Sequence, residues 1–273
     1  MDWNGYPIID DATPPQELFD PMRARGLVPR DPAEPHDPML APPSLIPLIP
    51  RSEWDARIKE QDALQSSLEH IYLGGSGGTP KFVNLDQNGN GYCWAYSTSQ
   101  ATMLGRLRDN MPHVRLNPHS VAAIIKRGAD EGGWCGLSAK FLREHGVAVE
   151  GTGPGQWPLH SRDLRYDTPA CRAEMARFKT TEDWVDISQN VWEQNLTFDQ
   201  VASCLLGDQP CALDFNWWGH SVCGVRLVKV ENGSYGIMIL NSWKGWGRYG
   251  LAVLQGDRAI PMGAVCLRTS RAS

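Results

Sequence analysis

Residues 87–97 read Gln-Asn-Gly-Asn-Gly-Tyr-Cys-Trp-Ala-Tyr-Ser, a glycine-rich loop that runs into a helical pattern. The pattern extends from Cys93 to about Arg108, and Pro112 ends it because proline cannot continue a helix. Cys93 is therefore expected at or near a helix N-terminus, where unpaired N–H groups and the helix dipole stabilise a thiolate. Such a thiolate, given a basic partner, is an activated nucleophile. Taken alone, Cys93 also fits a small buried residue without chemistry.

Length and composition set the class of protein. A chain of 273 residues with 41% hydrophobic and 21% charged residues is typical of a globular protein with one large or two small domains. The net charge of −5 and the lack of a basic run argue against nucleic-acid binding. No apolar run approaches the roughly 20 residues that cross a bilayer, and no secretory signal is seen. We therefore expect no membrane contact, and an intracellular (cytoplasmic) protein or one assembled in a particle.

The seven cysteines are an odd number and include no C-x-x-C pair. Five of them stand mostly in apolar surroundings and are expected to be reduced core residues: Cys171, Cys204, Cys211, Cys223 and Cys266. Zinc is not expected, because no Cys/His set has the spacing of zinc ligands. We predict no metal and no other cofactor.

Three regions follow from the pattern along the chain. Residues 1–50 hold twelve of the twenty prolines and are predicted to form an extended, irregular arm. Residues 51–79 are predicted to form a helix from Ser52, its N-cap, to about Leu73, followed by a flexible glycine-rich joint over residues 74–78. Residues 80–273 form the body that carries the chemistry.

The spacing of apolar residues in the body changes from helical to strand-like halfway along, which predicts an α+β fold. Its first half is helical, with expected helices at Cys93–Arg108, Asn117–Lys126 and Leu137–His145. Residues 151–200 show only a short helical pattern near residues 170–178. The second half is strand-like and antiparallel, at Cys211–Phe215, Ser221–Val230, Tyr235–Asn241 and Gly250–Leu254. Asn232-Gly233 is the signal of a tight hairpin turn between the second and third strands.

That hairpin is predicted to bring His220 and Asn241 together, since one opens a strand and the other ends the next. A histidine oriented by an amide oxygen and facing a thiolate is the thiol form of the nucleophile, base and orienter triad. Each residue has a structural alternative. His220 alone fits a hydrogen-bonded histidine at a strand end, and Asn241 alone fits a turn residue.

Three segments together resemble the papain-like cysteine peptidases over roughly residues 80–270. They are Gln87-x5-Cys93-Trp94-Ala95-Tyr96-Ser97, then Gly219-His220-Ser221, then Asn241-Ser242-Trp243-x2-Trp246-Gly247, in the family's order of Cys, His and Asn. The resemblance implies the papain fold, with the helical half carrying the cysteine and the sheet half carrying the histidine and asparagine. It also implies hydrolysis of a protein or peptide substrate.

Roles carry over position by position. The resemblance implies that Cys93 is the nucleophile, His220 the general base and acid, Asn241 the residue that orients the imidazole, and Gln87 an oxyanion donor beside the Cys93 N–H. Four further positions are implied to contact substrate or to shield the site: Gly132, Gly133, Trp94 and Trp243. The glycine pair would line the cleft where an extended substrate binds, although it equally fits a plain turn.

The sequence departs from the family at several positions. Asn90 and Asp130 stand where secreted members carry a cysteine pair, which favours a reducing compartment and predicts no disulfide there. Residues 51–79 lack the helical signature of the usual inhibitory propeptide. Tyr92 replaces a small residue and is expected to narrow the mouth of the site.

We therefore expect a thiol endopeptidase that acts through an acyl-enzyme. One alternative is a papain-fold structural protein of an assembly, such as a virion, with weak or no turnover; another is an acyl-transfer or deamidase enzyme. The arm has two possible roles. An inhibitory arm would pass Gly132 and Gly133 and cover Cys93, whereas a tether would leave Cys93 open and dock on the body or on a partner chain. The tether is expected, because the inhibitory signature is missing.

Overall fold

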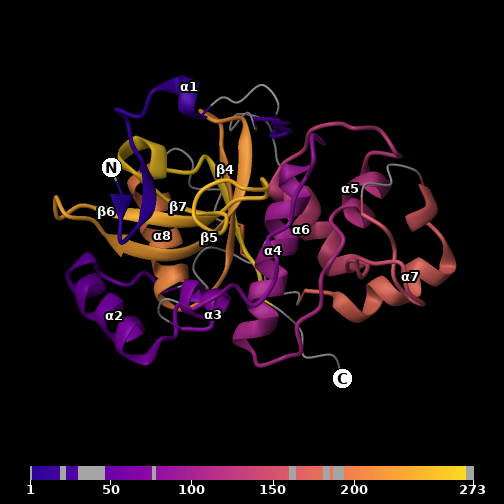
Figure 1. Cartoon of the computed structure of the whole chain (residues 1–273), viewed down its shortest axis with the longest axis horizontal. Coiled ribbons are helices and arrows are strands. Elements are labelled where there is room, and N and C mark those ends of the chain that lie inside the picture. The colour runs from indigo at the N-terminus through magenta and orange to yellow at the C-terminus, as the bar shows by residue number, and fades with distance from the viewer. Residues whose placement is uncertain are drawn as a thin grey trace.

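Two halves of the molecule lie side by side, as the computed structural model shows for residues 2–18, 23–29, 47–75, 78–159, 164–180, 185–186 and 194–268. A β-sheet with its flanking helices forms one half, and a group of helices forms the other (Figure 1). Helix α4 (Cys93–Arg108) stands between them. The predicted α+β class, with a helical half and a sheet half, is confirmed.

Within the described residues, eight strands form one sheet in the order β1-β2-β7-β6-β5-β4-β8-β3. The strands are β1 (Asp2–Trp3), β2 (Tyr6–Ile9), β3 (Val185–Asp186), β4 (Cys211–Phe215), β5 (His220–Lys229), β6 (Tyr235–Leu240), β7 (Leu251–Gln255) and β8 (Gly263–Cys266). Neighbours are antiparallel except β2 and β7, which are parallel. The strands predicted in the body pair antiparallel, as expected, and the arm adds β2 in parallel at the edge, so the whole sheet is mixed.

The four strands predicted in the body, β4 to β7, each lie within one residue of their expected bounds. Their side chains are buried in long continuous runs, because helices cover the sheet and leave no solvent-facing alternation. The turn between β5 and β6 uses Gly233 at a φ of 82°, which the Asn-Gly signal predicted. This hairpin places the start of β5 beside the end of β6, where the site lies.

Helix α4 is buried on nearly all sides, from Cys93 to Arg106. A helix that is covered all round belongs in the core of a protein rather than on its surface. Hydroxyl pairs tie it to both halves. Ser97 Oγ lies 2.8 Å from Ser221 Oγ in β5, and Thr98 Oγ1 lies 2.7 Å from Ser138 Oγ in α6 (Cys135–Glu144). The position of Cys93 is therefore fixed relative to both halves.

The predicted single helix over residues 52–73 is two helices, α2 (Arg51–Leu64) and α3 (Leu68–Leu73). Gln65 adopts a left-handed conformation with φ of 53° and ends the first helix. The side chain of Ser67, rather than that of Ser52, caps a helix, since it accepts a hydrogen bond from His70 N. Gly74 and Gly75 have positive φ, whereas residues 76–77 of the predicted joint lie outside the described residues.

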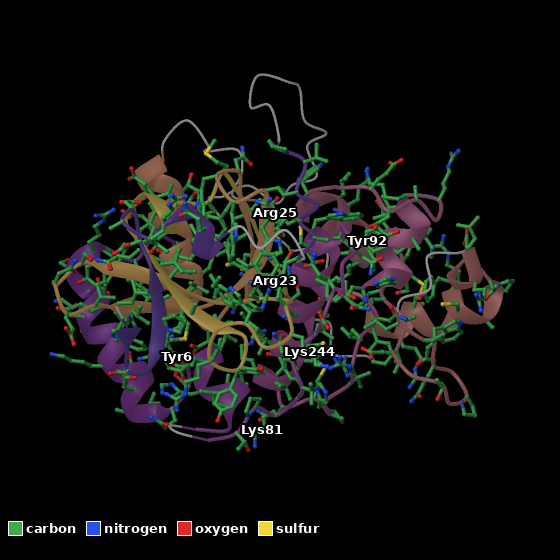
Figure 2. All side chains as sticks on the ribbon, turned by 45° about the horizontal axis from the view of Figure 1, so that its top comes forward. Tyr6, Arg23, Arg25, Lys81, Tyr92 and Lys244 are labelled. Carbon is green, nitrogen blue, oxygen red and sulfur yellow. The ribbon has the colours of Figure 1, made fainter. Side chains whose placement is uncertain are left out.

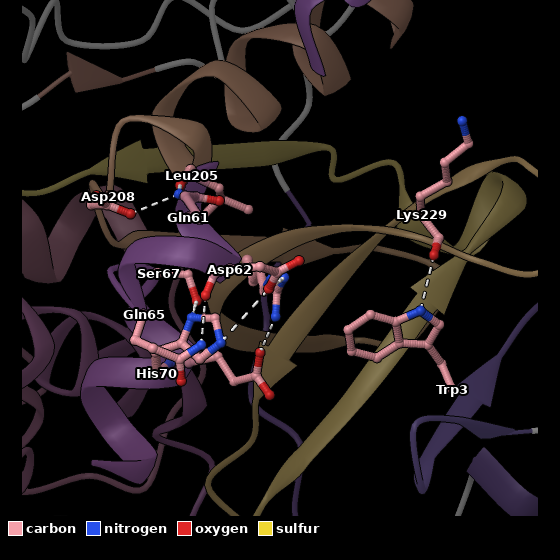
Figure 3. Close-up of polar contacts among 11 residues, drawn as sticks. Trp3, Gln61, Asp62, Gln65, Ser67, His70, Leu205, Asp208 and Lys229 are labelled. Atoms are coloured by element: carbon pink, nitrogen blue, oxygen red, sulfur yellow. Dashed lines mark hydrogen bonds and ion pairs between the residues drawn. The ribbon is translucent and has the colours of Figure 1, made fainter. Parts of the chain in front are cut away.

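Polar contacts fasten this helix pair to the sheet half (Figure 3). Gln61 Nε2 donates to Leu205 O at 2.9 Å and to Asp208 Oδ1 at 2.6 Å. Arg226 of β5 donates to Glu69 Oε2 at 2.6 Å and also to Asp62. Because Arg226 and Glu69 are almost fully buried, this ion pair lies in the interior rather than on the surface.

The remaining helices complete both halves. They are α5 (His119–Ile125), α7 (Pro169–Met175) and α8 (Gln194–Leu206), with short 3₁₀ turns at Leu164–Tyr166, Ala176–Phe178 and Gly256–Ala259. Helix α8 contacts β4, β5 and β8 and lies in a region where the sequence predicted no long helix. Across the described ranges, no helix is both long and apolar enough to pass through a bilayer.

The N-terminal arm was expected to be irregular, but part of it forms regular structure. It contributes β1, β2 and a short helix, α1 (Pro15–Leu18). The Trp3 indole N–H donates to Lys229 O at 2.9 Å, so the start of the arm is fixed on the sheet (Figure 3). Residues 23–29 lie elsewhere, between the two halves, and residues 30–46 are outside the described residues.

Candidate active site

Cys93 occupies the first position of α4, as predicted, with Tyr92 as the N-cap residue. The loop before it needs left-handed backbone at Asn88, with φ of 42°, and at Gly89, with φ of 78°. Asn and Gly tolerate this conformation, which explains their presence in the loop. The Cys93 thiol is fully buried.

His220 and Asn241 meet at the open end of the β5–β6 hairpin. His220 Nε2 lies 2.8 Å from Asn241 Oδ1. Because a carbonyl oxygen accepts, Nε2 carries the proton, and Nδ1 keeps a free lone pair. Among the described residues, Nδ1 has no hydrogen-bond partner. Trp243 stacks on the imidazole, with ring centroids 4.3 Å apart and planes 22° apart, and covers it from solvent.

Gln87 is held by Ser242, the residue that follows Asn241. The Ser242 hydroxyl donates to Gln87 Oε1 at 2.7 Å, and Gln87 N donates to Ser242 O at 3.0 Å. Oε1 is thus an acceptor, and the Nε2 donor is turned the other way. Nε2 donates to Ala24 O at 2.7 Å and to Asn90 O at 2.8 Å. Trp243 Nε1 donates to the same Ala24 carbonyl at 3.3 Å.

Residues 23–29 of the arm therefore lie over these side chains, between the two halves (Figure 2 labels Arg23 and Arg25). Gly26 N donates to Cys93 Sγ at 3.3 Å. The next residues pair with Gly133 as a parallel bridge, in which Gly133 N donates to Gly26 O at 2.8 Å and Val28 N donates to Gly133 O at 2.9 Å. Leu27 N donates to Gly219 O at 3.2 Å.

The expectation of a tether that leaves Cys93 open is wrong. The arm docks on the sheet through β2 and also covers the thiol with residues 23–29, so docking and covering are not alternatives. Close approach depends on glycine. A Cβ at Gly26 would lie 1.8 Å from Gly91 O, and a Cβ at Gly132 would lie 2.6 Å from Gly26 O. No larger residue fits either position without a shift.

The glycine pair is backed by Trp94. A Cβ on Gly133 would lie 2.6 Å from the Trp94 ring, which is itself fully buried. Trp94 thus supports the backbone of Gly133 from behind. Tyr92 does not narrow the mouth of the site as expected, because it is buried and its hydroxyl donates to Ala129 O at 2.6 Å.

Burial changes the protonation of both titratable groups. Burial raises the pKa of the Cys93 thiol to about 12, although the backbone N–H groups of Gly26, Ser221 and Trp94 oppose it. Burial lowers the pKa of His220 to about 3, Asn241 opposes it, and the charge of Arg25 lowers it further. The covered site therefore holds a neutral thiol and a neutral imidazole at neutral pH.

The position of the absent cysteine pair is filled by polar contacts. Asp130 Oδ1 accepts from Gly91 N at 2.8 Å, one residue after Asn90. Asn90 Nδ2 donates to Gln87 O at 2.8 Å and so braces the loop. All seven cysteines are free thiols and buried.

Some residues of the site could not be predicted from the sequence, because they come from distant parts of the chain. Arg25 donates to Trp218 O at 3.2 Å, and Trp218 contacts both His220 and Trp243 edge-on. The Trp217-Trp218 pair next to His220 was a signal of an aromatic wall. Nothing local marked Ala24 or Gly26, because their role depends on contacts more than 60 residues away along the chain.

Comparison with solved structures finds cysteine proteases. Xylellain, a cysteine protease from Xylella fastidiosa, aligns with 92% of this chain and 97% of its own, with a TM-score of 0.59 and 16% identity. Digestive procathepsin L 3 from the larval midgut of Tenebrio molitor aligns with 83% of this chain and 91% of its own, with a TM-score of 0.52 and 16% identity. A recombinant stem bromelain precursor aligns with 68% of this chain and 66% of its own, with a TM-score of 0.51 and 15% identity. No protein-family model and no curated protein matches the sequence. The chain has the fold of the papain-like cysteine proteases.

Proposed function

We propose that the protein is a thiol endopeptidase that is held inactive by its own arm. The observation that carries the proposal is the pairing of His220 with Asn241 beneath Trp243. The backbone N–H of Ser221, the residue after His220, contacts the thiol of Cys93 at the N-terminus of α4. This is the nucleophile, base and orienter arrangement of thiol acyl-transfer chemistry.

In the proposed reaction, His220 Nδ1 takes the thiol proton, and Cys93 Sγ attacks the carbonyl carbon of the substrate. Gln87 Nε2 and the Cys93 N–H then stabilise the charge on the carbonyl oxygen. His220 returns the proton to the leaving amine, which departs and leaves a thioester on Cys93. Water, deprotonated by His220, hydrolyses the thioester and restores the thiol.

The arm is bound as an inhibitor and not as a substrate. Gln87 Nε2 donates to the Ala24 carbonyl, as it would to a substrate. Cys93 Sγ, however, accepts from the Gly26 N–H, two residues further on. The contact recorded for Sγ is thus with an amide N–H of the arm, two residues away from the carbonyl that Gln87 holds, and this offset supports an arm that occupies the site without being cleaved there.

The test uses Gly26→Ala in the full chain. The added methyl group clashes with Gly91 O, while β1 and β2 stay in place. Removing residues 1–50 would be less clean, since it also strips β2 from the sheet. We expect an epoxide or vinyl-sulfone thiol probe to label Cys93 at least about tenfold faster in Gly26→Ala, because overpacking costs about 1–3 kcal/mol.

The same variant should hydrolyse a peptide library, and adding Cys93→Ala or His220→Ala should abolish the turnover. Val28→Ala is the matched control, because Val28 binds Gly133 through its backbone and its side chain is 51% exposed. A labelled Cys93 with no hydrolysis of any library would contradict the peptidase and favour acyl transfer or a structural role. Labelling of another cysteine would contradict the site.

A further inference from the structure

Three of the buried cysteines converge far from Cys93, although they are scattered along the chain. Cys204 comes from α8, Cys211 opens β4 and Cys266 ends β8. Their Sγ atoms all lie within 4.8 Å of one another, and each side chain is at most 1% exposed. The sheet register sets two of them opposite each other, since Cys211 and Cys266 are Cα partners. The spacing in sequence gave no sign of this cluster, because it depends on strand order.

The geometry suits a metal ion that binds three sulfurs. Three thiolates around an ion at about 2.3 Å lie about 4 Å apart in a trigonal plane. The three sulfurs lie within 4.8 Å of one another, so only a small inward movement brings them to this spacing. Within the described part of the chain, no histidine, aspartate or glutamate joins the group, so a fourth ligand of the kind zinc takes is missing. Soft thiolates suit monovalent copper as well as zinc, and the lack of a fourth protein ligand favours copper over zinc here.

Two arginines place positive charge near one of the three sulfurs. Three thiolates and one monovalent ion leave two excess negative charges. The guanidinium charges of Arg268 and Arg108 both act on Cys266. Arg108 is held in place, since it donates to Gln209 Oε1 at 2.7 Å and to Asp208 O at 3.2 Å.

The cluster lies just beneath the surface turn that joins α8 to β4. Gly207 in this turn is exposed, and the half-buried Gln209 accepts through its carbonyl from Cys211 Sγ at 3.7 Å. Entry of an ion through this turn requires it to open, which breaks the hydrogen bonds that Gln61 and Arg108 make with Asp208 and Gln209. Each thiol loses its proton to solvent as it coordinates.

We propose that Cys204, Cys211 and Cys266 form a three-thiolate site for a monovalent copper ion, which ties α8 to strands β4 and β8. The site is separate from the proposed active site, so its test is independent of peptidase activity.

The test titrates the full chain anaerobically with Cu(I) against a chromogenic Cu(I) chelator. We expect one tightly bound ion per chain and a rise in the thermal midpoint on binding. Cys204→Ala and Cys266→Ala should each weaken binding by more than about a hundredfold, above what loss of an outer-shell partner costs. Cys223→Ala, another fully buried free thiol, and Cys93→Ala are the controls and should retain the ion.

X-ray absorption of the unmodified chain keeps the test decisive if a variant does not fold. Three sulfur neighbours near 2.3 Å support the site. Two sulfurs or fewer, equal loss of binding in Cys223→Ala, retained binding in a folded Cys204→Ala, or displacement of Cu(I) by equimolar Zn(II) would each overturn it.

Discussion

Gln87 shows at the scale of one residue how the proposed site is oriented. Its Oε1 is engaged by the Ser242 hydroxyl, so only Nε2 can face a substrate carbonyl. Gln87→Ala should lower kcat by roughly 10²–10³ with little change in KM, since the lost bond forms mainly as charge develops on the oxygen. Steady-state kinetics on Gly26→Ala, with and without the Gln87 change, measure this effect.

Ser242→Ala is a milder variant of the same site, because it removes only the hydrogen bond that orients the Gln87 amide. We expect a smaller loss of kcat, about tenfold. A rise in KM at constant kcat for Gln87→Ala would show that the side chain binds the ground state, and that the oxyanion role is wrong.

The residues of the proposed site could be predicted because each stands in a short, recognisable sequence motif. Cys93 follows a glycine-rich loop, and His220 and Asn241 flank a hairpin with an Asn-Gly turn. The hairpin geometry alone brings the last two within 2.8 Å. Gly26 could not be predicted, because glycine carries no signal by itself and its constraint comes from the distant Gly91 carbonyl.

At the scale of elements, the joint between α3, β5 and β2 depends on one buried carboxylate. Glu69 accepts from Arg226 at 2.6 Å, and it forms a hydrogen bond with Tyr6 of β2. Burial, followed by the charge of Glu69, raises the pKa of the Tyr6 hydroxyl above its ordinary value, so this hydroxyl stays protonated. One side chain therefore joins a helix, a central strand and the arm.

Glu69→Ala should lower the free energy of unfolding by about 3 kcal/mol, because it leaves the buried Arg226 guanidinium short of a counter-charge. Denaturant unfolding measures the loss. Glu60→Ala is the control, since its side chain is 57% exposed and should change stability by less than about 0.5 kcal/mol. Equal effects of the two variants would mean that the buried pair contributes nothing.

Elements with strong local signals were predicted well, and those that depend on partners were not. Strands β4 to β7 were found from runs of buried apolar residues, whereas β2 and β8 are short segments whose strand character comes from their neighbours β7 and β4. The break at Gln65 was missed because the apolar stripe continues across it.

At the scale of the whole molecule, acid should release residues 23–29 from the site. Covered His220 has a pKa of about 3, against an ordinary value near 6.5, and Arg25 of the arm adds to the depression. We expect an uncovered His220 to return towards the ordinary pKa, so that between these two values only the uncovered form binds a proton. Each unit of falling pH therefore favours uncovering by up to about tenfold, and neutral pH restores the cover.

The measurement is the rate of Cys93 labelling from pH 7 to pH 4, divided by the rate for Gly26→Ala at the same pH. The division removes the pH dependence of the probe and of the thiol itself. We expect this ratio to rise towards one in acid while circular dichroism stays unchanged. A constant ratio would show that His220 does not couple to the arm.

The attachment of β2 to β7 has a kinetic consequence for the arm. About a dozen residues separate Ile9, which is fixed in the sheet, from Arg23 at the start of the covering segment. A tether of this length holds its end at an effective concentration in the millimolar range. Dilution therefore does not release the segment, and a free peptide of residues 23–29 competes only at millimolar concentration. The chain also joins these residues to α2 on their other side, so lasting exposure of Cys93 requires a cut on each side of residues 23–29. Any displacement without both cuts is reversed within the same molecule.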